Sequence, residues 1–171
     1  DRFYQLHVIL TGTIHVNLDE KSYVVKAPMF FLTPPTVPHA FITDSHAKGH
    51  VITVRQQLVW QLMESMMATG WDKGNFMTSP LCVSLVPEKN KNATHLLELL
   101  SLIAHENQQS GVEQDFALKA LLQLILIDIL RLADQSQPQQ KTRKEDIRIF
   151  HLFNQLIESH YKEHLTLSQY S

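Results

Sequence analysis

The stretch FYQLHVILTGTIHVNLDEKSYVVKA, residues 3–27, decides the fold class. Apolar and polar residues alternate along it with a period of two, as around Ile14 and Val16, which is typical of strands with one buried face. Gly12 and the polar segment 19–21 interrupt the alternation, and glycine can take the positive φ that a tight hairpin needs. The stretch therefore predicts three short strands joined by two tight hairpins.

The next segment, APMFFLTPPTVPHAF (residues 27–41), contains three prolines within residues 34–38. Prolines in this number exclude a helix and a place in the centre of a sheet, so the segment predicts an extended, kinked crossing between strands. A final strand, HVITVRQQ, follows at residues 50–57. Short strands with turn residues about every ten positions indicate a small barrel or jelly roll, with a sandwich as the main alternative.

After residue 57 the apolar period changes to that of a helix. The spacing predicts amphipathic helices over residues 58–68, 94–108 and 112–134, with Thr94 near the start of the second. The loop between the first two helices contains one short strand around residues 83–86. The chain is thus an α+β protein whose sheet residues precede most of its helical residues.

Composition narrows the function classes. The 171 residues carry a formal net charge of −2, so no overall basic field attracts a phosphate backbone. The single cysteine, Cys82, cannot form an internal disulfide, and no cysteine pair has zinc spacing. No apolar stretch reaches membrane-spanning length, and a cytoplasmic protein is expected. The chain starts within a strand-like run and lacks an initiating Met, which indicates part of a longer protein.

Two strand faces in the β-rich half mix polar with apolar side chains. His7 shares a face with Gln5, and Arg55 shares a face with Thr53. Such faces suit the lining of a small-molecule cavity, and a guanidinium inside one needs an anion such as a ligand carboxylate. The alternatives are a hydrogen-bonded core histidine, and an arginine that lies at the surface or pairs with a protein carboxylate.

The helix over residues 112–134 is apolar around most of its circumference, so it must be covered on two sides. A second copy of the chain can cover one side, which predicts a homodimer through this helix; the alternative is that the neighbouring helices complete the burial within one chain. The residues of the predicted dimer stripe are Leu118, Leu121, Leu122, Ile125, Ile129 and Leu132.

Two stretches resemble the AraC/XylS family of transcription regulators. FHLFNQLIESHYKEHLTLSQYS, residues 150–171, looks like the opening of that family's double helix-turn-helix domain. FYQLHVILTGTIHVNLD, APMFFLTPPTVPHAF and HVITVRQ are similar to the sensor domain of the subgroup that responds to hydroxylated aromatic acids, such as 4-hydroxyphenylacetate and hydroxybenzoates.

This resemblance implies an N-terminal cupin-like β-barrel (1–57), a helical dimerisation region (58–134), a linker (135–144) and the first helix of an all-α DNA-binding domain (145–171). It implies a small aromatic acid as effector, with no cofactor. His39 and Phe41 of the PHAF segment join Arg55 as its expected contacts. DNA would be bound only through the rest of the helix-turn-helix domain, which residues 145–171 do not complete.

Two other functions stay open. A metal-dependent cupin enzyme is suggested by three histidines, His7, His15 and His39. However, the close HxH pair of metal cupins is missing, and the alternation of the strand places His15 toward water. No carboxylate pair or activated nucleophile indicates catalysis, so no metal and no enzyme activity are expected. A sugar-sensing regulator of the same family is the second alternative, because polar and aromatic groups also bind carbohydrates.

Overall fold

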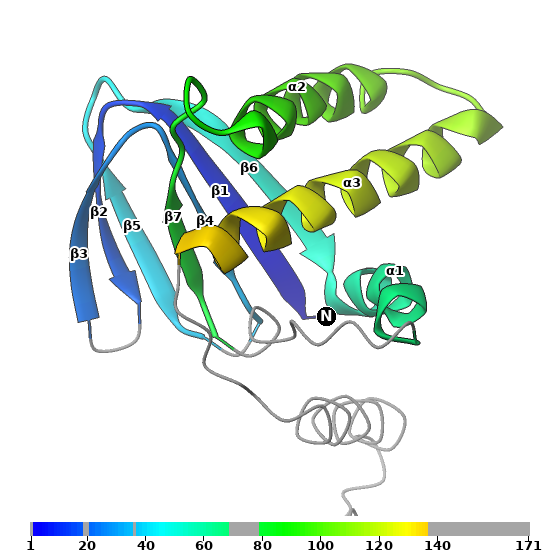
Figure 1. The fold of residues 1–171 in the computed structure, drawn as a ribbon, viewed down its shortest axis with the longest axis horizontal. Coiled ribbons are helices and arrows are strands. Elements are labelled where there is room, and N and C mark those ends of the chain that lie inside the picture. Colours follow the sequence, from blue (N-terminus) through cyan, green and yellow to red (C-terminus); the bar gives the residue numbers. More distant parts are fainter. Residues whose placement is uncertain (1, 19–20, 36, 69–78, 137–171) are drawn as a thin grey trace, which may run out of the picture.

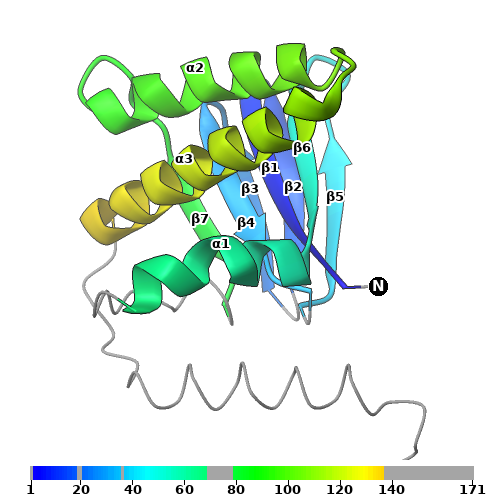
Figure 2. The same cartoon turned by 90° about the vertical axis from the view of Figure 1, so that its right-hand side faces the viewer.

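The computed structural model describes residues 2–18, 21–35, 37–68 and 79–136. Two antiparallel sheets face each other, and helices cover the outer face of the larger one (Figures 1 and 2). The larger sheet has the order β6-β1-β4-β7, and the smaller has the order β3-β2-β5. The strands are β1 (Phe3–Thr11), β2 (Thr13–Leu18), β3 (Lys21–Lys26), β4 (Met29–Thr33), β5 (His39–Thr43), β6 (Lys48–Arg55) and β7 (Leu81–Ser84).

The described strands form a cupin-like β-sandwich. No backbone pairing joins the two sheets into a closed barrel within the described residues, so the expectation of a barrel is corrected to the sandwich alternative. The sheets meet instead through side chains, in an apolar cluster of Ile9, Ile14, Val16, Met29 and Phe31.

The turn at Gly12 is a crossing between sheets and not a hairpin. β1 pairs with β4 and β6, whereas β2 pairs with β3 and β5, so only the second of the two expected hairpins forms. Gly12 has a φ of 89°, and a Cβ there would lie 2.7 Å from the Cα of Ala47. Asp44 stabilises this crossing, because its carboxylate accepts a hydrogen bond from the Thr13 backbone N–H at 2.8 Å.

β4 corrects the expectation drawn from the prolines. Its five residues are all buried, and it lies between β1 and β7 in the centre of the larger sheet. The prolines begin at Pro34, directly after the strand ends at Thr33, so they remove no hydrogen bond from the ladder.

The helices are α1 (Gln56–Ala68), α2 (Lys91–Glu106) and α3 (Val112–Ser136), which confirms the three helices expected from the apolar period. α2 starts earlier than expected, because Asn90 and not Thr94 is its N-cap: the Asn90 side chain accepts a hydrogen bond from the Asn92 N–H at 2.9 Å. None of the described helices combines the length and apolarity needed to cross a membrane.

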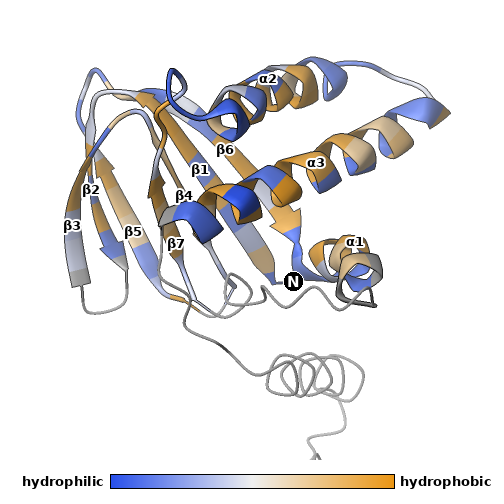
Figure 3. Cartoon of the chain, viewed as in Figure 1, coloured by the Kyte–Doolittle hydropathy of each residue, from blue (hydrophilic) through white to orange (hydrophobic). Residues whose placement is uncertain are grey.

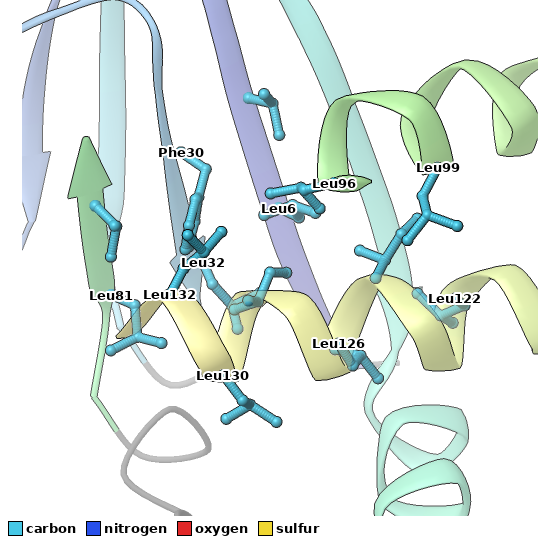
Figure 4. Close-up of a cluster of buried hydrophobic side chains, with 14 of the residues drawn as sticks. Leu6, Phe30, Leu32, Leu81, Leu96, Leu99, Leu122, Leu126, Leu130 and Leu132 are labelled. Atoms are coloured by element: carbon cyan, nitrogen blue, oxygen red, sulfur yellow. The ribbon is translucent and has the colours of Figure 1, made fainter. Parts of the chain in front are cut away.

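Sheet and helices share one hydrophobic core. Leu6 of β1 lies beside Leu96 of α2 and faces α3, and β7, the short strand expected around residues 83–86, adds Leu81 (Figure 4). Apolar residues run along both α2 and α3, interrupted by hydrophilic ones (Figure 3). Because strand and helix side chains fill the same cluster, the helices from 58 onward are packed onto the sheet.

The C-terminal expectations fall mostly outside the described residues. α3 continues through Gln135 and Ser136, the first two residues of the expected linker. The rest of the linker and the expected start of a helix-turn-helix domain at 145–171 lie outside the described residues.

Candidate functional site

Strand register places the polar residues of β1 and β6 on one face. Gln5 lies opposite Thr53, and Phe3 lies opposite Arg55. Directly opposed residues of an antiparallel pair point to the same side, so these residues share the side of His7. That side faces the smaller sheet, since Ile9 on the same face belongs to the cluster between the sheets.

β5 supplies the other half of the cluster. Phe41 lies opposite the buried Val16 in the smaller sheet and therefore points inward. Its ring centroid is 4.1 Å from that of His7, 5.4 Å from that of His39 and 5.4 Å from that of Phe31. Four rings from three strands and both sheets thus contact one another.

Gln5 connects the two imidazoles. Its Oε1 is 2.6 Å from His39 Nε2 and 3.4 Å from His7 Nε2. The other nitrogen of His39 lies 2.9 Å from the Val37 carbonyl oxygen, which can only accept, so Nδ1 carries a proton. An amide offers both a donor and an acceptor, so Gln5 can partner the free nitrogen of His39 in either protonation state. We call Gln5, His7, Phe31, His39 and Phe41 the inter-sheet cluster.

The pKa of His7 is lowered to about 4, mainly by burial of the ring and additionally by the neighbouring His39. His7 is therefore neutral at pH 7. A neutral imidazole presents one donor, one acceptor and an aromatic face, while the buried residues beneath it, Ile9, Ile14, Val16 and Met29, are apolar. The inter-sheet cluster thus combines aromatic faces with hydrogen-bonding groups above an apolar floor.

Four of the six expected ligand residues come together here: Gln5, His7, His39 and Phe41. Thr53 and Arg55 are exposed on the neighbouring strand, and no contact joins either side chain to the cluster in the described part of the chain. Both belong to the lining of a groove bounded by β6, α2 and α3. Phe31 was missed by the sequence analysis; its register position opposite His7 becomes visible only once β4 is recognised as a strand.

The expected dimer stripe lies largely in the core of the chain itself. Ile125 and Ile129 are 0% exposed, and they belong with Leu122 and Leu132 to the cluster shared with the sheet. Leu118 and Leu121 are half-buried. This matches the alternative in which neighbouring elements of the same chain cover that stripe. The exposed apolar residues of α3 lie elsewhere, at Val112, Phe116 and Leu124.

The described residues offer little support for a metal site. No three His, Cys, Asp or Glu side chains there converge to hold an ion. His15 is exposed on the outer face of the smaller sheet, as its alternation predicted, and is therefore separated from His7 and His39.

A sandwich backed by helices, with a partly polar aromatic cluster between its sheets, defines a small-molecule-binding domain of the cupin-like class. Residues 1–126 match the family model of the AraC-like ligand binding domain, and the chain belongs to this family. The family supports a ligand-responsive regulator that binds a small-molecule effector. No curated protein matches the chain.

Proposed function

We propose that this chain senses a small aromatic acid for a transcription activator of the AraC/XylS type, and that the effector binds at the inter-sheet cluster. The observation that carries the proposal is the contact of His7 with Phe41 across the two sheets. A hydroxylated aromatic ring can occupy this space by separating the two rings and stacking between them, which replaces one aromatic contact by two.

The polar groups of the cluster suit the substituents of such an acid. His39 and Gln5 already form a short hydrogen bond, and a phenol hydroxyl of the effector can take the place of Gln5 by donating to His39 Nε2, or a carboxylate can accept from Nε2 when the ring is protonated on both nitrogens. Arg55, the carboxylate partner expected from the sequence, lies on the same face of the sheet through its pairing with Phe3, and no contact in the described residues joins its side chain to the cluster.

We propose further that the regulator is a homodimer through the helix over residues 112–134, using its exposed side. Val112, Phe116 and Leu124 recur at helical spacing on α3, and Phe116 is 74% exposed. Exposed apolar residues grouped on one helix are typical of an interface. The buried stripe of the same helix then holds the sandwich, so one helix carries both contacts.

The mechanism is a population shift. An effector that binds one arrangement of sandwich and helices more tightly than another favours that arrangement by its difference in affinity. The helix-turn-helix domain expected after the linker reads DNA, and the effector changes how the dimer presents it.

Calorimetric titration tests the effector class. We expect 4-hydroxyphenylacetate, 4-hydroxybenzoate or 3-hydroxybenzoate to bind and arabinose not to bind. Replacing Phe41 by Ala or His39 by Leu should weaken binding at least about tenfold, which is ~1.4 kcal/mol. The matched control is His15→Leu on the outer face of the same sheet, which should bind normally.

Arabinose binding instead of the acids would favour the sugar-sensing alternative. Stoichiometric iron, nickel or zinc in protein purified without chelator would revive the cupin enzyme, with His7 and His39 as ligands. For the dimer, Phe116→Lys should lower the mass measured by light scattering, whereas Leu102→Lys on α2, which is also exposed, should leave it unchanged. A monomeric parent protein would contradict the dimer.

A further inference from the structure

β6 is an edge strand of the larger sheet, since β1 is its only partner among the described strands. With eight residues it is the longest of the described edge strands, and an edge strand presents unpaired backbone groups that can pair with another chain. Lysine, proline and bulges protect such edges in proteins. β6 has its lysine and its bulge only at Lys48, so residues 50–55 carry no protection of this kind.

The backbone hydrogen bonds identify which groups of β6 are free. The Gln56 N–H donates to the Arg2 carbonyl oxygen at 2.9 Å, and these two residues form the next pair of the β1–β6 register. Hydrogen-bonded pairs alternate with non-hydrogen-bonded pairs in an antiparallel ladder. Every second residue from Gln56 back along β6 therefore bonds to β1, whereas the N–H and C=O groups of Val51 and Thr53 point to the free edge. Both residues are exposed.

A groove of about 710 Å³ follows this free edge, between β6, the C-terminal half of α2 and the N-terminal half of α3. Residues 50–55 of β6 all line it, although alternate side chains point to opposite faces of the sheet, so the groove runs beside the backbone. Ile103 of α2 and Leu118 of α3 are half-buried there, and an entering apolar side chain would cover them. The connected ends of α2 and α3 reach beyond β6 and would lie over a strand added to its edge (Figure 1).

The charges beside the edge favour an added strand that carries a carboxylate outside the groove. β6 contains no acidic residue, and Arg55 forms no ion pair with the described residues. The register places Arg55 on the side of the inter-sheet cluster, away from the helices. Opposed residues of an antiparallel pair share a face, so a carboxylate opposite Arg55 would meet the guanidinium on that side. Within the groove, Asp115 and Lys119 neutralise each other, which favours apolar side chains.

We propose that the free edge of β6 binds an extended peptide of a partner protein by strand addition. The backbone groups of Val51 and Thr53 hydrogen-bond the peptide, and an acidic residue of the peptide pairs with Arg55. Apolar side chains opposite Ile52 and Val54 enter the groove between α2 and α3. The partner thereby stabilises the position of both helices on the sheet, and this site is independent of the effector proposed above.

The probe is the synthetic peptide Ac-Glu-Leu-Thr-Leu-Thr-Ser-NH2, followed by amide hydrogen exchange. In the antiparallel register its Glu lies opposite Arg55, and its two leucines lie opposite Val54 and Ile52. In the free protein, the amide protons of Val51 and Thr53 should exchange at least about tenfold faster than those of Ile52 and Val54, which bond to β1. Saturating peptide should slow the exchange at Val51 and Thr53 at least about tenfold.

Modified peptides separate strand addition from binding by side chains alone. N-methylation of either threonine removes an N–H that faces β6 and should weaken binding at least about tenfold. The matched control is N-methylation of either leucine, whose N–H points away from β6, and it should weaken binding less than about threefold. Replacing the Glu by Gln should weaken binding to the parent protein at least about threefold and leave binding to Arg55→Met unchanged.

Two tryptophan substitutions on α2 test the groove. Ala104 is exposed and lines it, so Ala104→Trp should fill the space for the leucines and weaken binding at least about tenfold. Ser101 is exposed on the same helix outside the lining, so Ser101→Trp should bind as the parent does. Circular dichroism and urea unfolding of each variant establish that it is folded.

Absence of peptide binding, equal losses from methylated threonines and methylated leucines, or unchanged binding by Ala104→Trp would each overturn the proposal. A second copy of the chain is the other possible occupant of the edge. Protection of the Val51 and Thr53 amides that rises with protein concentration, without any peptide, would assign the edge to that copy and would also overturn the proposal.

Discussion

His95 Nδ1 of α2 lies 2.5 Å from Asp128 Oδ2 of α3, although the Asp128 side chain is only 1% exposed. The second carboxylate oxygen accepts a hydrogen bond from Arg131 Nη1 at 3.0 Å. A carboxylate removed from water is costly unless its oxygens are partnered. Arg131 partners Asp128 from the same helix, and the contact with His95 ties α2 to α3.

Replacing His95 by Ala should lower the free energy of unfolding by about 1–3 kcal/mol, because it leaves the buried Asp128 carboxylate with Arg131 as its remaining partner. Urea denaturation measures the loss. The control is Lys119→Ala, which breaks the exposed Asp115–Lys119 pair on α3 and should cost less than about 0.5 kcal/mol. Similar losses in both variants would show that burial of Asp128 adds nothing.

Stability should fall as the pH drops from about 6.5 toward 4. The pKa of His7 is about 4 in the folded chain, below its ordinary value of 6.5, so the unfolded chain binds this proton first. The stability that neutral, buried His7 contributes is fully present above pH 6.5 and is lost as the pH falls through the pKa of the folded chain. We expect about 1–2 kcal/mol, reduced by the partial exposure of the ring. Urea unfolding at pH 7 and pH 4.5 should show a smaller drop for His7→Gln than for His15→Gln.

Gly12→Ala should destabilise the sandwich by about 2–3 kcal/mol. The residue has a φ of 89°, and its new Cβ would collide with the Ala47 backbone where the chain crosses between sheets. Gly111 offers a comparison in the turn between α2 and α3. Its φ is also positive, but a Cβ there meets only the flexible Glu113 side chain, so Gly111→Ala should cost about 1 kcal/mol. Thermal unfolding that ranks the two in the opposite order would contradict the crossing at Gly12.

Gln56→Met should raise the free energy of unfolding by about 1 kcal/mol. Gln56 is buried at the start of α1, and its Oε1 accepts no hydrogen bond from any residue that the structure describes. An apolar side chain of similar length removes the cost of burying that oxygen. The neighbouring Gln57 is exposed, so Gln57→Met should change little. A destabilised Gln56→Met would mean that the oxygen has a partner.

The sequence predicted which face of a strand each side chain occupies better than it predicted which strands pair. The period of two set which residues lie beside His7, and the observed register keeps Gln5 and Thr53 on that side. It could not show that β1 and β2 belong to different sheets, because a positive φ at Gly12 serves a crossing as well as a hairpin. Nor could it bring His39 to Gln5, a contact between residues 34 positions apart.

The helical stripe shows the same limit. A continuous apolar face on residues 112–134 indicates burial, but the element that covers it depends on β7 and α2, whose positions are set by tertiary contacts. Ile125 and Ile129 are therefore buried within the chain, where the pattern had been interpreted as contact with a second copy. The central position of β4 was missed for a different reason: a rule about prolines was extended to the residues before them.

Alternate residues of β1 point to opposite sides of one sheet. Gln5 and His7 contact β5, while Leu6 between them lies against Leu96 and faces α3 (Figure 4). The face of the inter-sheet cluster and the face covered by the helices are thus the two sides of a single backbone, one peptide layer apart. A rigid-body movement of β1 alters both surfaces in the same step, and a relay through intermediate side chains is unnecessary.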